Sequence, residues 1–196
     1  MHDGFPKDQK TKIEKFINLA LRFNKTHNIF SRKKERNIYI KDVLDCAPLV
    51  KHIKANKSVL DLGSGGGFPG ILLSITKPNN NIVLLESSEK KCYFLRTIKE
   101  ELSLKNTKII NQKIDNKNKL GTFDVITARA FAETKKILKL TENNIHPNTK
   151  YLLLKGKEAT INKELQDIDN KRYKYEIIKH DFKGFERNTV LIKINE

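Results

Sequence analysis

The fold of this chain follows from one glycine-rich segment, Ser58-Val-Leu-Asp-Leu-Gly-Ser-Gly-Gly-Gly-Phe-Pro-Gly-Ile-Leu-Leu-Ser-Ile75. A short apolar run with Asp61 near its end is followed by five glycines within eight residues and then by a second apolar run, which predicts a strand, a tight turn and a helix that begins near Phe68. Glycines in such a turn permit positive φ angles and remove the Cβ atoms that would keep a ligand away from the backbone. The free N–H groups of the helix point to the same place. The segment therefore predicts a cofactor-binding turn.

Two templates fit this turn, and they predict different cofactors. Residues 65–70 match G-x-G-x-x-G, the fingerprint of dinucleotide binding. Read from Asp61, the segment is instead D-x-G-x-G-x-G, with a carboxylate at the strand end and glycines at Gly63, Gly65 and Gly67. A carboxylate there repels a pyrophosphate but suits the ammonium group of S-adenosylmethionine, directly or through water. We favour S-adenosylmethionine over NAD, with these four residues in its site; a glycine-rich turn without a ligand is the third interpretation.

Length and composition are those of a single intracellular domain. The 196 residues suffice for one full hydrophobic core. The chain has no signal-peptide pattern and no apolar run near the roughly 20 residues of a membrane span, so we expect a cytoplasmic protein that does not bind membranes. Cys46 and Cys92 lack metal-site spacing, and we expect reduced thiols and no bound metal. We also expect a monomer.

The charge of the chain favours a polyanionic partner. The formal net charge is +16 and the pI about 9.7, values typical of proteins that act on nucleic acid. Residues 1–57 hold 14 Lys and Arg against 6 Asp and Glu, which is half of the excess. A lysine-rich composition bias is the alternative, but bias alone does not concentrate charge at one end. The candidate RNA contacts here lie beside Phe30 and Tyr39, whose rings can stack on bases, and are Arg32, Lys33, Lys34 and Arg36.

The N-terminal third is interpreted as a helical cap. Residues 7–24 form a helix candidate, and Thr11 and Glu14 have the spacing of a capping box if the helix begins there. Its apolar stripe consists of Ile13, Phe16, Ile17, Ala20 and Phe23. After a polar linker, residues 24–36, we expect a second helix that Pro48 breaks or restarts and that is marked by Ile40, Val43, Leu44 and Ala47. We divide the chain into this cap, residues 1–57, and a Rossmann-like domain, residues 58–196.

From residue 58 on, strand and helix patterns alternate with short connections, as in a parallel sheet covered on both sides. The expected strands after the first are residues 81–86, 107–111, 123–129, 151–155, 175–182 and 189–194. The last two are close enough to form a hairpin around residues 183–187. Seven mostly parallel strands with a closing hairpin are typical of class I S-adenosylmethionine-dependent methyltransferases rather than of NAD domains, and this is the α/β fold that we predict.

Polar residues at the expected carboxyl ends of the strands mark the cleft, because ligands bind outside those ends. Glu86 ends the second strand, where a ribose diol would donate two hydrogen bonds to one carboxylate; capping the next helix is the alternative. Ile114 and Asp115 follow the third strand and suit an adenine. Arg129 and Lys155 end the fourth and fifth strands, and two cations at neighbouring strand ends are hard to explain as solvated surface.

Several short motifs add a family resemblance. The most specific is Gly67-Phe-Pro-Gly-Ile71, which includes a proline that the dinucleotide template leaves unexplained. The others are Asn24-Lys25 through Asn28, Val43-Leu-Asp45, Leu62 to Gly66, Phe94-Leu-Arg96, Arg129-Ala-Phe131, Leu154-Lys-Gly156 and Glu186-Arg187. With these motifs the chain resembles, over nearly its whole length, the RsmG (GidB) family of bacterial methyltransferases of small-subunit ribosomal RNA.

The resemblance implies methyl transfer from S-adenosylmethionine to N7 of one guanine in 16S ribosomal RNA, near the decoding centre, with this RNA or the 30S subunit as partner. It places cofactor contacts on Gly63, Phe68, Ile114, Asp115 and Arg129. It places RNA or substrate contacts on Lys155 and Arg187. We take Arg129 and Lys155 as the catalytic candidates.

Three positions depart from the family pattern. Asn28-Ile29-Phe30 stands where many members have Asn-Leu-Thr, Asp42 where they have histidine, and Lys113 where they have arginine. We keep Lys113 as a candidate RNA contact. The departures concern RNA docking more than cofactor binding.

The expected chemistry needs no general base, because guanine N7 carries a lone pair and no proton. Catalysis is then mostly positioning of the base against the methyl group. The chain lacks the Asp/Asn-Pro-Pro-aromatic motif of amino-group methyltransferases and the Pro-Cys nucleophile of cytosine-C5 enzymes. Because the methylated base is cationic, we expect Arg129 and Lys155 to bind carboxylate, O6 or phosphate rather than N7. Two rival functions stay open: a non-catalytic RNA-binding ribosome-assembly factor with this fold, and an NAD-dependent oxidoreductase.

Overall fold

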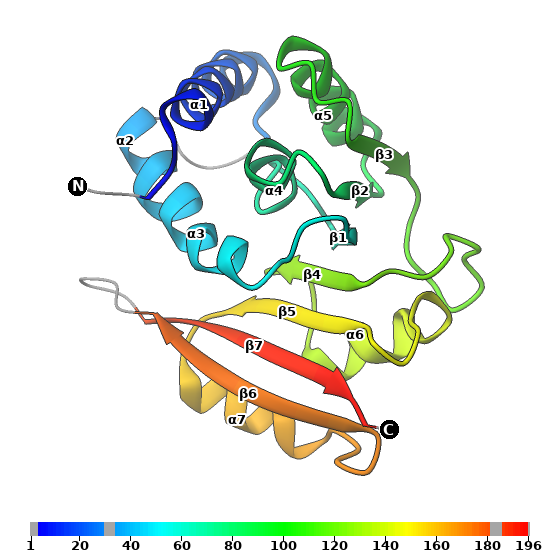
Figure 1. Cartoon of the computed structure of the whole chain (residues 1–196). Coiled ribbons are helices and arrows are strands. Elements are labelled where there is room, and N and C mark those ends of the chain that lie inside the picture. Colours follow the sequence, from blue (N-terminus) through cyan, green and yellow to red (C-terminus); the bar gives the residue numbers. More distant parts are fainter. Residues whose placement is uncertain (1–3, 30–33, 181–185, 196) are drawn as a thin grey trace.

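A single seven-stranded sheet forms the centre of the computed structural model, which describes residues 4–29, 34–180 and 186–195 (Figure 1). The strand order is β3-β2-β1-β4-β5-β7-β6. Strand β7 is antiparallel to both neighbours, and the other pairs are parallel. The strands are β1 (Ser58–Leu62), β2 (Asn81–Glu86), β3 (Thr107–Asn111), β4 (Val125–Arg129), β5 (Lys150–Lys155), β6 (Tyr173–His180) and β7 (Arg187–Ile194). The predicted α/β fold, including the closing hairpin of β6 and β7, is confirmed.

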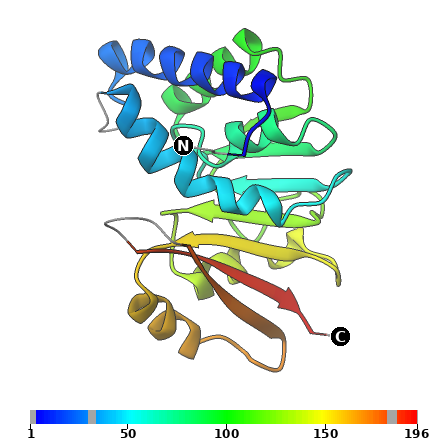
Figure 2. The same ribbon diagram turned by 60° about the vertical axis from the view of Figure 1, so that its left-hand side comes forward.

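Helices cover both faces of this sheet. The helices are α1 (Lys7–His27), α2 (Glu35–Ile38), the π-helix η1 (Tyr39–Val43), α3 (Leu44–Lys51), α4 (Gly70–Thr76), α5 (Glu89–Glu101), α6 (Thr134–Leu140), the short 3₁₀-helix η2 (Glu142–Asn144) and α7 (Glu158–Gln166). Alternate strand residues enter two separate cores. Val59 and Leu152 pack with α1, α3, α4 and α5, whereas Leu60 and Leu153 pack with α6 and α7. Figures 1 and 2 show the two sets of helices on opposite sides of the sheet.

Helix α1 begins at Lys7, as expected for the helix candidate of residues 7–24, so Thr11 and Glu14 lie inside it and the condition for a capping box is not met. Pro6 occupies the N-cap position, and the Thr11 hydroxyl donates to the Lys7 carbonyl (3.1 Å) inside the helix. Proline is favoured at a helix start because the N–H that it lacks has no partner there. The helix also runs past residue 24 and ends at Asn28, which has the left-handed φ of 47° of a C-cap. Four residues of the predicted stripe are fully buried: Ile13, Phe16, Ile17 and Ala20.

Pro48 lies inside α3 and does not break it, contrary to the sequence expectation. The chain is helical without interruption from Glu35 to Lys51, with the π-helical η1 in the middle. A π-turn inserts one residue per turn and thereby rotates the side chains that follow it. The buried face therefore differs from the predicted apolar stripe and consists of Ile38, Asp42, Val43, Asp45, Cys46 and Leu49. Two carboxylates are thus turned toward the interior.

The core on the α1 side continues across residue 57. Phe16 of α1 lies in the same cluster as Ile71 of α4 and Phe94 of α5. Its ring centroid is 4.9 Å from that of Phe68, in the glycine-rich segment. The division into a cap, residues 1–57, and a domain, residues 58–196, stays a prediction.

Three smaller observations concern the cysteines, metals and membranes. Cys46 and Cys92 are both buried and free. The residues described here contain no group of three or more His, Cys, Asp or Glu side chains placed to hold a metal ion. No helix within the described ranges combines the length and the apolar character needed to cross a membrane.

The glycine turn lies between β1 and α4, where the order of the sheet reverses: β2 and β3 lie on one side of β1, and β4 and β5 on the other. Ligands of open α/β sheets bind at such a point. Gly63, Gly65 and Gly67 have φ angles of 64°, 53° and 89°, which glycine adopts at little cost. Gly67 is also tightly packed, because an added Cβ would lie 2.8 Å from Cγ1 of Ile71 and 2.9 Å from Cζ of Phe16. Helix α4 begins at Gly70, slightly later than expected.

Replacement of Gly67 tests this packing. Gly67→Ala should lower the unfolding free energy by about 2 to 4 kcal/mol, because left-handed strain and overpacking of the core add to each other. Gly121→Ala is the matched control, since Gly121 has a φ of 82° but nothing within 4 Å of an added Cβ; it should cost only about 1 to 2 kcal/mol. Urea unfolding measures both values. Equal losses would contradict the packing of α1 against the turn.

Candidate active site

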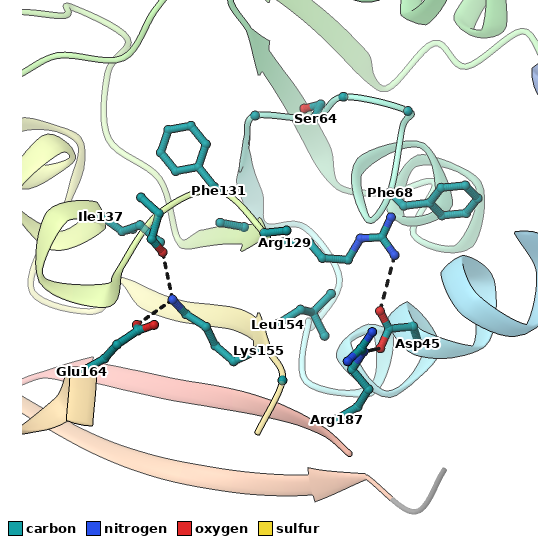
Figure 3. A pocket seen from close by; sticks show the side chains of 17 residues that line it. Asp45, Ser64, Phe68, Arg129, Phe131, Ile137, Leu154, Lys155, Glu164 and Arg187 are labelled. Atoms are coloured by element: carbon teal, nitrogen blue, oxygen red, sulfur yellow. Dashed lines mark hydrogen bonds and ion pairs between the residues drawn. The ribbon is translucent and has the colours of Figure 1, made fainter. Parts of the chain in front are cut away.

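A cavity of about 580 Å³ opens at the carboxyl ends of β1, β4 and β5. Its walls are the glycine turn, residues 128–132 at and after the end of β4, and residues 154–156 at the end of β5 (Figure 3). Single side chains from α3, α6, α7 and β7 complete it: Asp45, Ile137, Glu164 and Arg187. Parallel strands bring their carboxyl ends to one edge, which is why three distant segments meet here. The predicted location of the cleft therefore agrees with the cavity.

Phe131 packs on the glycine turn. An added Cβ at Gly63 would lie 2.5 Å from Cδ2 of this ring, so only glycine leaves room for it. Ala130, directly before, has a φ of 51°, a conformation that costs a non-glycine residue about 1 to 2 kcal/mol. Strained backbone of this kind clusters at functional sites. With 37% of its surface exposed, Phe131 is an aromatic ring that lines the cavity and remains open to a ligand.

Asp61 is fully buried beneath the turn and does not line the cavity. Its carboxylate faces the start of α4, since an added Cβ at Gly70 would lie 2.5 Å from Oδ2. Neither carboxylate oxygen has a hydrogen-bond partner of normal geometry among the described residues. Burial raises the pKa of Asp61 to about 7, and the nearby Ser64 hydroxyl, the positive charge of Arg129 and the Gly70 N–H offset this only in part. A direct contact between Asp61 and a cofactor stays a prediction.

Glu86 fastens the glycine turn to the second strand. Its Oε2 accepts a hydrogen bond from the Gly65 N–H (2.9 Å), and its Oε1 accepts one from the Ser88 N–H (2.8 Å). Ser88 is the N-cap of α5. The hydrogen bond from Ser88 therefore agrees with the alternative interpretation of Glu86, in which this residue caps the following helix. A carboxylate has about four acceptor positions, so two remain for a ribose diol. The ribose contact stays a prediction.

The residues expected around an adenine follow β3 and do not line the cavity. Ile114 is buried and packs in the core on the α6 side. Asp115 is exposed: its Oδ1 accepts from the Lys117 N–H (2.7 Å), and its own N–H donates to Asn118 Oδ1. Lys113 is exposed. The adenine contacts of Ile114 and Asp115 stay a prediction.

Arg129 is paired with two carboxylates of the N-terminal helices. Its Nη2 lies 2.7 Å from Asp42 Oδ1, and its Nη1 lies 3.4 Å from Asp45 Oδ2. The guanidinium also stands over the Phe68 ring, 5.6 Å from the centroid. Arg187 Nε lies 3.0 Å from the other oxygen of Asp45 (Figure 3). Burial raises the pKa of Asp45, and the charges of Arg187 and Arg129 oppose this effect.

Lys155 is held by a second network at the other end of the cavity. Its Nζ donates to the Ala132 carbonyl (2.8 Å) and to Oε2 of Glu164 (2.7 Å). The same oxygen of Glu164 accepts from the N–H (2.8 Å) and the hydroxyl (2.6 Å) of Thr134. Against the effect of burial, hydrogen bonds from Lys155 and Thr134 lower the pKa of Glu164. Glu164 is therefore ionised at neutral pH and balances the ammonium charge.

The structure thus brings together some of the predicted site residues. Those that line the cavity are Gly63, Gly65, Phe68, Arg129, Lys155 and Arg187. Sequence reasoning gave no role to the acidic partners Asp42, Asp45 and Glu164, nor to the ring of Phe131. Asp45 and Phe131 belong to the short motifs of the family resemblance, and these motifs could have identified them as site residues. No local sequence pattern marks Glu164.

The candidate RNA contacts near the N-terminus are only partly described. Lys34 and Arg36 are exposed at the start of α2. Arg32, Lys33 and Phe30 lie outside the described residues. Their contact with RNA stays a prediction.

Solved methyltransferases share this fold. A SAM-dependent methyltransferase from Aquifex aeolicus matches with a TM-score of 0.65 over 88% of this chain and 97% of its own, at 16% identity. A ribosomal protein L11 methylase from Lactobacillus delbrueckii subsp. bulgaricus matches with a TM-score of 0.63 over 80% of each chain, at 12% identity. The fold is that of class I S-adenosylmethionine-dependent methyltransferases.

Within this class, the chain belongs to the rRNA small subunit methyltransferase G (GidB) family, whose model matches residues 9–190. A relative from Ruthia magnifica subsp. Calyptogena magnifica with the name ribosomal RNA small subunit methyltransferase G is 38% identical over 150 residues, 76% of this chain and 73% of the relative. A relative of the same name from Francisella tularensis subsp. tularensis (strain SCHU S4) is 32% identical over 178 residues, 91% of this chain and 84% of its own. The family resemblance found in the motifs is confirmed.

The burial of Asp61 predicts an unusual pH dependence. In the unfolded chain this carboxyl loses its proton near pH 4, whereas the folded chain keeps it until about pH 7. The folded state binds more protons in this window, so Asp61 lowers stability as the pH rises, by up to about 1.4 kcal/mol per pH unit. The unfolding free energy of Asp61→Asn, relative to that of the unmodified protein, should therefore increase as the pH rises from 4.5 to 7. Urea unfolding at several pH values measures this difference.

Asp124→Asn is the control for this series. Against the effect of burial, hydrogen bonds from Lys57 and Ser58 lower the pKa of Asp124 to about 2, so this carboxyl is ionised over the whole range. Its substitution should give a constant difference in unfolding free energy. A constant difference for Asp61→Asn as well would show that Asp61 is ionised in the folded protein at pH 4.5.

Proposed function

We propose that this chain transfers a methyl group from S-adenosylmethionine to N7 of a guanine in 16S ribosomal RNA of the small subunit. Family membership supports the reaction class and the RNA. The observation that carries the proposal is the cavity, in which the glycine turn, the Phe131 ring and the Lys155 ammonium face one space. A cofactor cradle, a stacking surface and a hydrogen-bond donor are the parts that such a reaction needs.

The residues around the turn fit S-adenosylmethionine. The turn has three glycines with positive φ, so its backbone is open to close approach. Gly63, Gly65 and Gly67 would hold the amino-acid part, with Phe68 beside it and the buried carboxylate of Asp61 beneath it attracting the ammonium group. The ribose and adenine would lie toward Glu86, Ile114 and Asp115. Arg129 would contact the cofactor.

The cofactor, when bound, supplies an electrophilic methyl group, and transfer leaves the S–C electron pair on sulfur while the N7 lone pair forms the new bond. No proton leaves the base, so no general base is needed. The two carboxylates that line the cavity, Asp45 and Glu164, both pair with cations and are not positioned as bases. The task of the protein is to hold N7 about 3 to 3.5 Å from the methyl carbon.

Phe131 and Lys155 are suited to hold the guanine. Stacking of a base on an aromatic ring contributes about 1 to 3 kcal/mol, and the exposed ring of Phe131 offers that surface. An ammonium group has three donors. Lys155 uses two of them on Ala132 and Glu164, so one is left for an acceptor such as O6. O6 is then bound while the N7 lone pair stays free.

A larger basic surface would dock the RNA. We assign to it Arg32, Lys33, Lys34, Arg36, Lys113 and Arg187, in a chain of net charge +16. The helical cap, residues 1–57, would then carry much of the RNA contact and the Rossmann-like domain, residues 58–196, the cofactor. We propose a cytoplasmic monomer that needs no metal. Binding of this kind weakens steeply with salt.

The direct test is transfer of a labelled methyl group to 30S subunits that lack the modification, followed by mapping of the labelled base. We expect one labelled guanine and loss of its N7 reactivity. RNA or 30S binding without transfer would favour the assembly-factor alternative. A thermal shift with NAD but none with S-adenosylhomocysteine would favour an oxidoreductase.

The role of Lys155 gives a second test. Lys155→Met keeps the length of the side chain but removes its donors, so we expect turnover on 30S subunits at saturating cofactor to fall about 100-fold, equivalent to about 2.7 kcal/mol. Binding of S-adenosylmethionine should be at least as tight as before. The control is Lys157→Met, which removes the same charge from an exposed position just past the cavity; it should change turnover less than about threefold. Similar losses in both variants would argue against a donor role for Lys155.

A further inference from the structure

Each cation that lines the cavity is paired with a carboxylate. The cations are Arg129, Lys155 and Arg187, and the carboxylates within 4 Å of them are Asp42, Asp45 and Glu164. The formal charge of these six residues is zero. The whole chain has a net charge of +16, so the charged side chains around the cavity differ from the rest of the molecule in that their charges cancel.

Glu164 is held in place by hydrogen bonds from two residues. One oxygen, Oε2, accepts from Lys155 and twice from Thr134 at 2.6 to 2.8 Å. The side chains of Lys155 and Glu164 are only 14% and 15% exposed, so water screens this pair poorly. Figure 3 shows the pair at one end of the cavity, apart from the Asp45 pair at the other end. Glu164 comes from α7, on the face of the sheet opposite to α3.

We propose that Glu164 is a positioning residue that cancels the charge of Lys155 so that the cavity accepts a cationic methyl donor. The inference rests on the proposed function for the identity of that donor. A sulfonium beside an uncompensated ammonium is repelled, and the repulsion is strong where the dielectric constant is low. With Glu164 in place, Lys155 keeps its N–H donor for the substrate without adding net charge.

The same balance holds during the reaction. Methyl transfer moves one positive charge from sulfur to the purine ring, and no proton enters or leaves. The cavity therefore contains one ligand cation before and after the step. Glu164 consequently removes the repulsion that Lys155 alone would exert on the charged donor and on the charged base, whereas the neutral thioether that remains on the cofactor is affected little by either charge.

The test uses the two forms of the cofactor as probes, because S-adenosylmethionine carries the sulfonium charge and S-adenosylhomocysteine does not. In Glu164→Gln we expect the Kd of S-adenosylmethionine, measured by calorimetry without RNA, to rise about tenfold. The Kd of S-adenosylhomocysteine should change less than twofold. The control is Glu176→Gln, which makes the same change of charge at an exposed position in the middle of the edge strand β6; it should leave both values within twofold.

Two further variants separate charge from structure. In Lys155→Met/Glu164→Gln the pair is neutral again, and the ratio of the two Kd values should return to within twofold of that of the unmodified protein. In Lys155→Met alone the uncompensated carboxylate should shift the ratio toward S-adenosylmethionine, and this variant tests the idea even if Glu164→Gln does not fold. Equal weakening of both ligands in Glu164→Gln, or an unchanged ratio in Lys155→Met, would overturn the proposal. If the unmodified protein binds neither ligand, the proposed donor itself is wrong.

Discussion

The glycine turn is clamped between two aromatic rings, and the rest of the site depends on that contact. Phe131, from the segment after β4, occupies the space over Gly63, while Phe16, from α1, occupies the space beside Gly67. Both places are available only because these residues lack a Cβ. The turn is therefore more than a gap left for a cofactor: it sets the distance between the N-terminal helix, β1 and β4. Because β1 and β4 are adjacent and parallel, that distance also fixes where the Phe131 ring lies relative to the glycine turn.

The N-terminal helices contribute to the cavity through charge as well as through packing. The π-helical η1 turns Asp42 and Asp45 toward the interior, where they meet Arg129 at the end of β4 and Arg187 at the start of β7. Removing one partner of such a buried pair costs about 3 to 5 kcal/mol, because the other charge is left without compensation. The network therefore holds three separate segments in register around the mouth of the cavity. In this chain Asp42 stands where many family members have histidine, and its contact with Arg129 gives that departure a structural role.

Much of this arrangement could be predicted from local sequence, and the missing part has a physical cause. Arg129 and Lys155 line the cavity, as expected, because a residue at the carboxyl end of a parallel strand lies at the cleft whatever the neighbouring helices do; their roles stay a prediction. Their partners could not be found in the same way: Asp45 is 84 residues from Arg129, and Glu164 reaches the cavity from a helix on the other face. The predicted apolar stripe of the second helix was wrong for a related reason. The prediction assumed 3.6 residues per turn, as in an α-helix, whereas η1 is a π-helix and has more residues per turn. Glu86 lies at the strand end as expected, and its hydrogen bond from Ser88 agrees with the capping alternative, but its hydrogen bond from Gly65 could not be read from the sequence.

The chain is strongly basic, whereas the charges of the side chains around the cavity cancel, and electrostatic screening explains why both are useful. Exposed cations attract RNA over distances near the Debye length, about 8 Å at physiological ionic strength, and salt screens that attraction. The paired charges inside are partly buried and are screened much less. A cavity with a large positive charge would attract phosphate but would repel a sulfonium and a methylated purine alike. Separating the two tasks, with exposed lysines outside and ion pairs inside, would let one chain hold a polyanion on its surface while a cationic group is transferred beneath it.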